Sequence, residues 1–437
     1  MDKYKIGIIG CGYVGLITGV CFAELGNKVI CHDIDKEKIV KLKQGIVPFF
    51  ELGLAKMFTK NKNRLSFTIS VEEVIENSDY IFICVGSPSR NNGEADTTSL
   101  FRVIDQINSY VKTYKMIIIK STVPVGTAKK VKELLKEKIE QDLIEVISNP
   151  EFLREGNAIY DFMNPDRIVI GADSFKKAKN VARLYQTFSC PILLVSNEDA
   201  ELIKYASNNF LAMKISFINE IANICERVGA DISKVSYGIG LDHRIGNNYL
   251  QAGLGFGGPC LTKDLKAMIA FCKRVITYEP HLLKAVLKVN ELQPELVIKK
   301  VKEVLGNLEG KRIGILGLSF KPGTDDMRNA PALKLITSLV KEGTELIAYD
   351  PKANKVAKEL LKDQIEFAKE PYQVSYQSYA LIIVTEWKEF LDLDYEKIKS
   401  YMIKPILVDG RNMFDNDRIQ KLKKMGFQYF GVGRNLL

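Results

Sequence analysis

The sequence IGIIGCGYVGLITGVCFAELGNKVICHD, residues 6–33, places a glycine-rich turn and a helix-like segment between two short apolar runs. The first run ends at the glycines, and the second ends at Asp33. Strand, turn, helix and strand in this order form the βαβ unit from which parallel sheets are built. This stretch therefore predicts an α/β fold that begins with a nucleotide-binding unit.

The turn has the spacing GxGxxG, with Gly10, Gly12 and Gly15. The first glycine permits a tight turn, the second lets the backbone approach a pyrophosphate, and the third allows close packing of the helix. The helix N-terminus then faces the phosphates. We expect Tyr13 and Val14, which lie between the last two glycines, to belong to the same cofactor site.

Asp33 lies about twenty residues beyond the turn, where a carboxylate accepts hydrogen bonds from an adenosine ribose. A carboxylate at this position repels a 2'-phosphate, which favours NAD over NADP as the cofactor. Lys36 and Lys38 follow closely and leave NADP open as an alternative.

The rest of the chain contains further apolar runs separated by helical stretches. The runs YIFICVG, MIIIKST, LIEVISN, RIVIG and PILLVS complete a predicted NAD-binding Rossmann domain over residues 1–196. Residues 197–300 keep helical spacing and predict a central connector and dimerisation domain. KRIGILGLSF begins a second Rossmann-like domain over residues 301–437, and the apolar runs ELIAYDP, YALIIVTEW and PILVDGRN continue it. The expected fold is α/β, with two Rossmann-like parallel-sheet domains joined by a long central helix and a helical segment.

Composition limits the classes of function. The net charge is +9, but the 62 Lys and Arg residues alternate with 53 acidic ones, which indicates solvated helix faces and argues against nucleic-acid binding. Eight scattered cysteines form no CxxC pair, and three histidines lie far apart, so we expect no metal site. The apolar runs are shorter than the roughly 20 residues that cross a bilayer, and no signal-peptide pattern is present. We therefore expect a reduced, cytoplasmic protein without a membrane segment.

The stretch GFGGPCLTKD, residues 255–264, has three glycines and a proline directly before a single cysteine. The glycines give the backbone next to the thiol unusual conformational freedom. Pro259 suits the first turn of a helix, which predicts that Cys260 lies at the helix N-terminus. There the helix dipole and Lys263 stabilise a thiolate, and Asp264 shares the helix face of Cys260. A small core cysteine after a turn is the alternative.

Two other segments show the same spacing of four residues. Glu151 and Glu155 follow a predicted strand, and Lys204 and Asn208 lie on the predicted long helix. Because the chain is rich in lysine and glutamate, surface ion pairs explain such spacing equally well.

Taken together, these motifs resemble those of the UDP-glucose/GDP-mannose dehydrogenase family. The matching stretches run in the family's order from residue 6 to about residue 412, and they are IGIIGCGYVGL, STVPVGT, SNPEFLREGNAIYDFMNPDRIVIG, ELIKYASNNFLAMKISFINEIA, YLQAGLGFGGPCLTKD, GLSFKPGTDDMRNAP and VDGRN. The resemblance implies oxidation of a sugar C6 alcohol to a carboxylate with reduction of two NAD molecules. Cys260 would form a thiohemiacetal and then a thioester. The loop YLQAGLGFGG is similar to the branch that acts on UDP-glucose, while GDP-mannose and UDP-N-acetylhexosamines stay open as substrates.

The resemblance also implies roles for single residues. Lys204 and Asn208 correspond to groups that stabilise oxyanions on C6. Thr122, Glu151 and Asp264 correspond to the group around a catalytic water, with Asp264 or that water as the proton acceptor.

Other positions correspond to residues that bind cofactor or substrate. Those near NAD are Glu155, Lys263 and Arg328 at the nicotinamide half and Lys38 at the adenosine half. Those that hold the sugar nucleotide include the C6-region residues Glu151, Glu155, Lys204 and Asn208, together with Phe152, Leu153, Arg154, Tyr249, Leu250, Gln251, Ala252, Gly253, Gly257, Lys321 and Arg411. In the family, the position of Arg244 reaches the active site of a neighbouring subunit, which implies a homodimer.

Two competing classes of protein remain. A two-electron hydroxyacid dehydrogenase also joins a Rossmann domain to a helical one, but it would need neither Cys260 nor the second α/β domain. A catalytically silent sugar-nucleotide or RNA binder would explain the positive charge, but it would have no use for the thiol.

Overall fold

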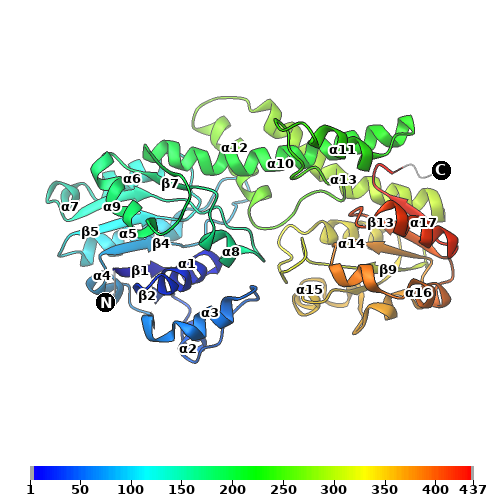
Figure 1. Ribbon diagram of the computed structural model, residues 1–437, viewed down its shortest axis with the longest axis horizontal. Helices are drawn as coiled ribbons and strands as arrows, with labels where there is room; N and C mark the ends of the chain where they lie inside the picture. The colour runs from blue at the N-terminus through cyan, green and yellow to red at the C-terminus, as the bar shows by residue number, and fades with distance from the viewer. Residues whose placement is uncertain (1–3, 435–437) are drawn as a thin grey trace. The chain divides into compact units, whose positions relative to one another are not determined.

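A computed structural model of the chain describes residues 4–434, and the chain forms two compact units. The first unit comprises Met1–Ser207 and Lys266–Thr277, and the second comprises Asn208–Leu265 and Tyr278–Leu437. Two helices, α10 (Asn197–Val228) and α12 (Leu261–Arg274), each contribute residues to both units (Figure 1). The domain boundaries expected from the sequence, at 196/197 and 300/301, stay predictions.

The first unit is built on an eight-stranded sheet in the order β3-β2-β1-β4-β5-β6-β7-β8. Its strands are β1 (Lys5–Ile9), β2 (Lys28–His32), β3 (Leu65–Thr68), β4 (Tyr80–Ile83), β5 (Lys115–Ile119), β6 (Ile144–Ser148), β7 (Ile168–Gly171) and β8 (Ile192–Val195). All neighbours are parallel except β6 and β7, which meet antiparallel at Ser148 and Gly171. The connecting segment, residues 149–167, begins and ends on the side of the sheet where β6 has its carboxyl end. It does not cross to the other side, so β7 runs antiparallel to β6. The sheet is therefore parallel except at this one junction.

Helices cover both faces of this sheet (Figure 1). One face packs against α1 (Tyr13–Glu24), α2 (Lys36–Lys43), α3 (Leu54–Lys60), α8 (Ala158–Met163) and α9 (Phe175–Ala182). The other packs against α4 (Val71–Asn77), α5 (Thr98–Tyr110) and α6 (Thr127–Leu134), with α7 (Lys136–Glu140) following α6. A sheet buried on both faces explains why its central strands read as continuous apolar runs. It also leaves the carboxyl ends of the strands as the edge where ligands bind in such folds.

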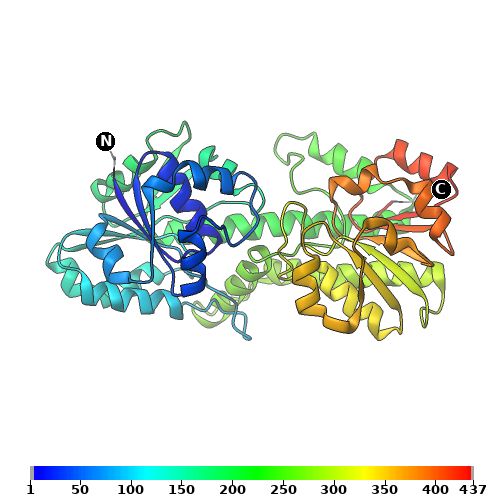
Figure 2. The same ribbon diagram turned by 90° about the horizontal axis from the view of Figure 1, so that it is seen from below.

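The second unit contains a six-stranded parallel sheet in the order β11-β10-β9-β12-β13-β14. Helices flank this sheet (Figure 2). Its strands are β9 (Arg312–Leu316), β10 (Glu345–Tyr349), β11 (Glu366–Phe367), β12 (Ala380–Ile383), β13 (Ile406–Asp409) and β14 (Gln428–Gly431). The second-unit part of α10 packs into one core with α11 (Ile232–Gly240), α13 (His281–Leu305), α14 (Pro331–Lys341) and α15 (Asn354–Leu361). The core on the other face includes α16 (Tyr395–Tyr401) and α17 (Asn416–Lys424).

The predicted fold class is confirmed, including a long helix of 32 residues. Three strands that sequence analysis did not single out, β3, β11 and β14, lie at sheet edges, where shorter and less apolar segments suffice. Across residues 4–434, no helix combines the length and apolarity that crossing a bilayer requires.

Candidate active site

The glycine turn between β1 and α1 has the geometry of a phosphate site. Gly10 has a φ of +100°, which L side chains rarely adopt, and a Cβ on Gly15 would lie 1.8 Å from the carbonyl oxygen of Gly10. Gly12 caps the N-terminus of α1, and a Cβ added there meets no atom within 4 Å. The backbone at the helix N-terminus is therefore sterically accessible, and the binding of a pyrophosphate there stays a prediction.

Asp33 directly follows β2 and lies beside the glycine turn. Its carboxylate accepts hydrogen bonds from the N–H groups of Cys11 (2.9 Å) and Asp35 (3.0 Å) and from the ammonium of Lys38 (2.9 Å). Burial alone would raise the pKa of Asp33, but the Asp35 N–H and Lys38 outweigh it and hold the pKa below its ordinary value. The group is an anion placed for a ribose diol, which fits NAD.

Glu51, which sequence analysis missed, connects this turn to the loop after β6. It accepts the hydroxyl hydrogen of Tyr13 and the N–H groups of Gly156 (2.8 Å) and Ala158 (2.8 Å). Burial and the Glu51 carboxylate raise the pKa of Tyr13, so its hydroxyl stays protonated and available as a donor.

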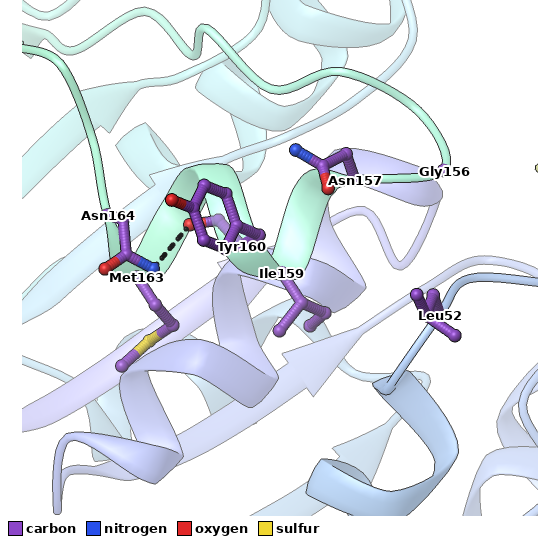
Figure 3. A pocket seen from close by; sticks show the side chains of 7 residues that line it. All are labelled: Leu52, Gly156, Asn157, Ile159, Tyr160, Met163 and Asn164. Atoms are coloured by element: carbon purple, nitrogen blue, oxygen red, sulfur yellow. Dashed lines mark hydrogen bonds between the residues drawn. The ribbon is translucent and has the colours of Figure 1, made fainter.

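A pocket of about 270 Å³ lies next to this connection (Figure 3). It is lined by residues of α8 and of the loops beside it, namely Leu52, Gly156, Asn157, Ile159, Tyr160, Met163 and Asn164. None of these residues was predicted to act in catalysis or binding.

Glu151 and Lys204 form a buried ion pair inside the first unit. Nζ of Lys204 donates to Oε1 of Glu151 at 3.0 Å, and Oε2 of Glu151 accepts the N–H of Leu153 at 2.6 Å. Burial would raise the pKa of Glu151, but the charge of Lys204 and the Leu153 N–H lower it to below the ordinary value. The lowered pKa keeps Glu151 ionised, although the side chains of both residues are more than nine-tenths buried.

The loop that carries Glu151 is not helical. Residues 149–157 form irregular structure between β6 and α8, so the four-residue spacing of Glu151 and Glu155 does not place them on one helix face. Lys204 and Asn208 do lie one turn apart on α10. Thr122, on the loop after β5, is anchored by the Ser87 hydroxyl, which donates to its carbonyl oxygen at 2.6 Å.

The residues that follow Glu151 have distinct surroundings. The guanidinium of Arg167 lies 3.8 Å from the centroid of the Phe152 ring, and Nζ of Lys204 lies 5.3 Å from it. Leu153 packs against the first-unit core. Arg154 is exposed and forms an ion pair with Asp161 (2.6 Å).

Cys260 is exposed and immediately precedes α12. Its carbonyl oxygen accepts the N–H of Asp264 at 2.9 Å, which is the first hydrogen bond of the helix. The helix begins at Leu261, so Pro259 lies outside it, and the expectation of Pro259 in the first turn was wrong. Cys260 still occupies the helix N-terminus, where a negative charge is favoured.

Asp264 is buried one turn beyond Cys260. Its Oδ2 accepts the side-chain amide of Asn208 at 2.6 Å, and its Oδ1 accepts the ammonium of Lys263 at 2.6 Å. The structure of the second unit therefore brings together Asn208, Lys263 and Asp264, three residues predicted from the sequence to act near the sugar C6 or the nicotinamide.

The side chains of two asparagines hold the loop from Tyr249 to Gly258 in place by hydrogen bonds to its backbone. The N–H of Gly253 donates to Oδ1 of Asn219 on α10 (2.8 Å), and the Asn290 side chain on α13 pairs with both backbone groups of Phe256 (2.7 and 3.0 Å). Tyr249 has a φ of +65°, a strained conformation that is common at functional sites. Sequence analysis missed both asparagines, although each is a polar residue facing inward from a helix.

Further predicted residues contact this loop or the backbone near it. The guanidinium of Arg411 donates to the carbonyl oxygens of Val384 (2.7 Å) and Gly255 (2.8 Å). A Cβ on Gly257 would lie 2.4 Å from the carbonyl oxygen of Asn329, so only glycine fits. Leu250 and Ala252 are buried, and Gln251 is exposed.

Three predicted cations lie elsewhere on the second unit. Lys321 lies 5.5 Å from the Phe320 ring centroid. Arg328 and Arg244 are exposed and pair with Asp326 and Asp242, respectively. Between residues 4 and 434, no three His, Cys, Asp or Glu side chains cluster as metal ligands would.

Three consecutive parts of the chain match the three domains of one known protein family. Residues 4–189 match the NAD binding domain of the UDP-glucose/GDP-mannose dehydrogenase family, residues 198–292 its central domain, and residues 314–416 its UDP binding domain. The chain belongs to this family. The resemblance, the class of enzyme and the NAD cofactor predicted from the sequence are therefore confirmed.

Individual members of the family resemble the chain over nearly its whole length. The UDP-glucose 6-dehydrogenase TuaD of Bacillus subtilis is 45% identical over 98% of this chain and 93% of that protein. The structure of a UDP-glucose dehydrogenase from Pyrobaculum islandicum matches with a TM-score of 0.92 and 36% identity, covering 99% and 98% of the two chains. A UDP-D-ManNAc dehydrogenase from Pyrococcus horikoshii has a TM-score of 0.87 and 27% identity, with 98% and 99% covered.

Proposed function

We propose that the chain is a UDP-glucose 6-dehydrogenase and that its predicted site residues have the roles described below. The observation that carries this proposal is the exposed Cys260 at the start of α12, with Asp264 and Asn208 hydrogen-bonded beneath it. A two-electron alcohol dehydrogenase needs no such thiol. The high similarity to UDP-glucose dehydrogenases, compared with the lower identity to the UDP-D-ManNAc enzyme, favours UDP-glucose as the substrate.

The first oxidation converts the C6 alcohol to an aldehyde. A bound NAD would supply the hydride acceptor for this step, and a second NAD molecule would supply it for the second oxidation. Asp264, or a water held by Thr122, Glu151 and Asp264, takes the hydroxyl proton. Asp264 is buried and already accepts two hydrogen bonds, so its oxygens are held in defined positions for this transfer.

The second oxidation needs the thiol. The Cys260 thiolate attacks the aldehyde carbon, a C–S bond forms, and the carbonyl electron pair becomes an alkoxide. The ammonium of Lys204 and the amide of Asn208 stabilise that oxyanion. Loss of a hydride then gives a thioester, and water adds to it, so that the C–S bond breaks and the carboxylate and thiolate are released.

The stoichiometry of NADH tests this proposal. UDP-glucose, GDP-mannose and UDP-N-acetylglucosamine are supplied separately with NAD, and the NADH formed per sugar consumed is measured. We expect two NADH per UDP-glucose and little turnover of the other sugars. One NADH per UDP-glucose would contradict the thioester route, and turnover confined to another sugar nucleotide would contradict the substrate.

We also infer that the chain forms a homodimer through α10. Within the second unit, this helix exposes an apolar stripe at heptad spacing, Phe210, Phe217 and Ile224, which Val228 continues. Exposed Tyr237 on α11 and exposed Leu241, which directly follows α11, belong to the same unit. Such a stripe on a long helix suits a second copy of the same helix.

Replacing Phe217 and Ile224 together with glutamate is expected to convert the dimer to a monomer, because charges in an apolar interface are costly to desolvate. Size-exclusion chromatography with light scattering measures the mass. Leu360→Glu, at an exposed apolar position on α15, is the matched control and should leave the dimer intact. A monomeric unsubstituted protein would contradict the inference.

A further inference from the structure

A second buried lysine, Lys120, lies beside the Glu151–Lys204 pair. It directly follows β5, and only 4% of its surface is exposed to solvent. Its Nζ donates to the side-chain oxygen (3.2 Å) and to the carbonyl oxygen (3.4 Å) of Asn149, the first residue after β6. Lys120 therefore ties the carboxyl ends of two neighbouring strands together.

These two strand ends carry residues assigned to the chemistry. Thr122 lies two residues beyond Lys120, and Glu151 lies two residues beyond Asn149. Asn149 is itself held in place, because its amide donates to the Val169 carbonyl at 2.8 Å and its oxygen accepts the Tyr185 hydroxyl at 2.6 Å. A substitution at Lys120 is therefore expected to alter the positions of both loops, because Lys120 is bonded to Asn149 and Asn149 is fixed by its other hydrogen bonds.

The charges around Lys120 are unusual for a buried site. The pKa of Lys120 is lowered to about 8, chiefly by burial and to a smaller extent by the nearby Lys204 charge, while Cys84 and Glu151 oppose the shift. These are the titratable groups that face the ammonium from β4, the loop after β6, and α10. Both Lys120 and Lys204 therefore interact electrostatically with the buried Glu151 carboxylate, and each lowers its pKa.

We propose that Lys120 is a positioning residue of the reaction, which holds the loops of Thr122 and Glu151 and places a second positive charge near Lys204, where the oxyanion forms. This inference rests on the proposed function. An unpaired charge in the interior is costly, and an apolar side chain of similar length would fill the same space. A purely structural role would therefore be served better by methionine than by lysine.

Lys115 offers a matched control on the same strand. It is also 4% exposed, it lies at the opposite end of β5, and its Nζ donates to the Ser78 carbonyl at 2.7 Å. Burial lowers its pKa as well, but neither Thr122 nor Glu151 lies near that end of the strand.

The experiment compares Lys120→Met, Lys120→Arg and Lys115→Met in the full chain, with kcat, the KM values and the thermal midpoint measured for each. Lys120→Met is expected to lower kcat at least about tenfold with little change in the KM for NAD, and to leave the midpoint at or above that of the unsubstituted protein. Lys115→Met should keep the original kcat. Lys120→Arg, which keeps the charge, should recover much of the lost kcat.

The pH profile separates this role from a structural one. Lys120 has a lowered pKa, so it is charged below about pH 8 and loses its proton above it. We expect kcat of the unsubstituted enzyme to decline as the pH rises through that value, and the decline in Lys120→Arg to move to higher pH, because arginine stays protonated.

The outcomes distinguish the two proposals. If the unsubstituted protein does not form two NADH per UDP-glucose, the proposed function fails. If it does, and folded Lys120→Met retains the original kcat and the same alkaline decline, the inference about Lys120 is overturned. If Lys120→Met fails to fold, the pH profile of Lys120→Arg decides between the two roles. A decline of kcat at the same pH as in the unsubstituted enzyme would overturn the inference.

Discussion

Replacing Cys260 with alanine is expected to lower the turnover of UDP-glucose at least about 1,000-fold, measured as NADH formed at saturating substrate and NAD. The planar aldehyde is a poor hydride donor. When the thiolate adds to its carbon, the product is a tetrahedral alkoxide, and the electron pair of that alkoxide can expel the hydride in the second oxidation. Cys260 is exposed and its carbonyl starts α12, so removing the sulfur leaves the backbone hydrogen bond to Asp264 in place. The loss should therefore concern the chemistry and not the fold.

Two further variants sharpen this test. Cys190→Ala removes another thiol that is not fully buried, and it should behave like the unsubstituted enzyme. Cys260→Ser should accumulate an ester of the sugar on the protein, detected as a mass increase in quenched reactions, because an oxygen ester hydrolyses more slowly than a thioester. Normal turnover by Cys260→Ala would rule out the covalent route.

Replacing Lys204 with alanine is expected to lower kcat by about 100- to 1,000-fold, since the oxyanion loses its ammonium partner. The variant should also lose about 3–5 kcal/mol of unfolding free energy, because Glu151 would stay buried without its ion-pair partner. Urea unfolding and steady-state kinetics measure the two effects.

The stability loss should depend on pH in a defined direction. In the unsubstituted protein the pKa of Glu151 is lowered, so its contribution to stability is present above its ordinary pKa and is lost as the pH falls through the lowered value. Without Lys204, the effect of burial dominates and the pKa of Glu151 rises, so the variant is most destabilised where this carboxylate must ionise. The difference in unfolding free energy should therefore be larger at about pH 8 than at about pH 5.

A double variant provides the control. Lys204→Met with Glu151→Gln removes both charges, and it should recover stability but not activity. A Lys204→Ala variant with nearly unchanged kcat would contradict the oxyanion role, whatever its stability.

Much of the fold could be predicted from the sequence, because its signals are local. The left-handed φ of Gly10 and the contact that only glycine allows at Gly15 follow from a spacing within one turn. Apolar runs between helical stretches predicted the central strands, since each of these strands is buried on both faces. The edge strands β3, β11 and β14 and the reversal at β7 carry no such signal.

The candidate site depended on local signals only in part. Cys260 and Asp264 lie one turn apart, so a helix-start motif was enough to relate them. Glu151 and Lys204 are separated by 53 positions, and their ion pair exists only because the end of β6 packs beside α10. No periodicity marks Asn219 or Asn290 as the side chains that hold the Tyr249–Gly258 loop, because their partners are backbone groups far away in the chain.

The amino-acid sequence by itself determined the two α/β sheets, the nucleotide turn and the exposed thiol, since steric limits on glycine, burial of apolar runs and helix starts act over a few residues. Only the tertiary structure decided which charges share a buried site. Whether Lys120, Lys204 and Glu151 meet depends on how the ends of β5 and β6 and the helix α10 pack together, and electrostatic coupling follows distance in space and not separation along the chain.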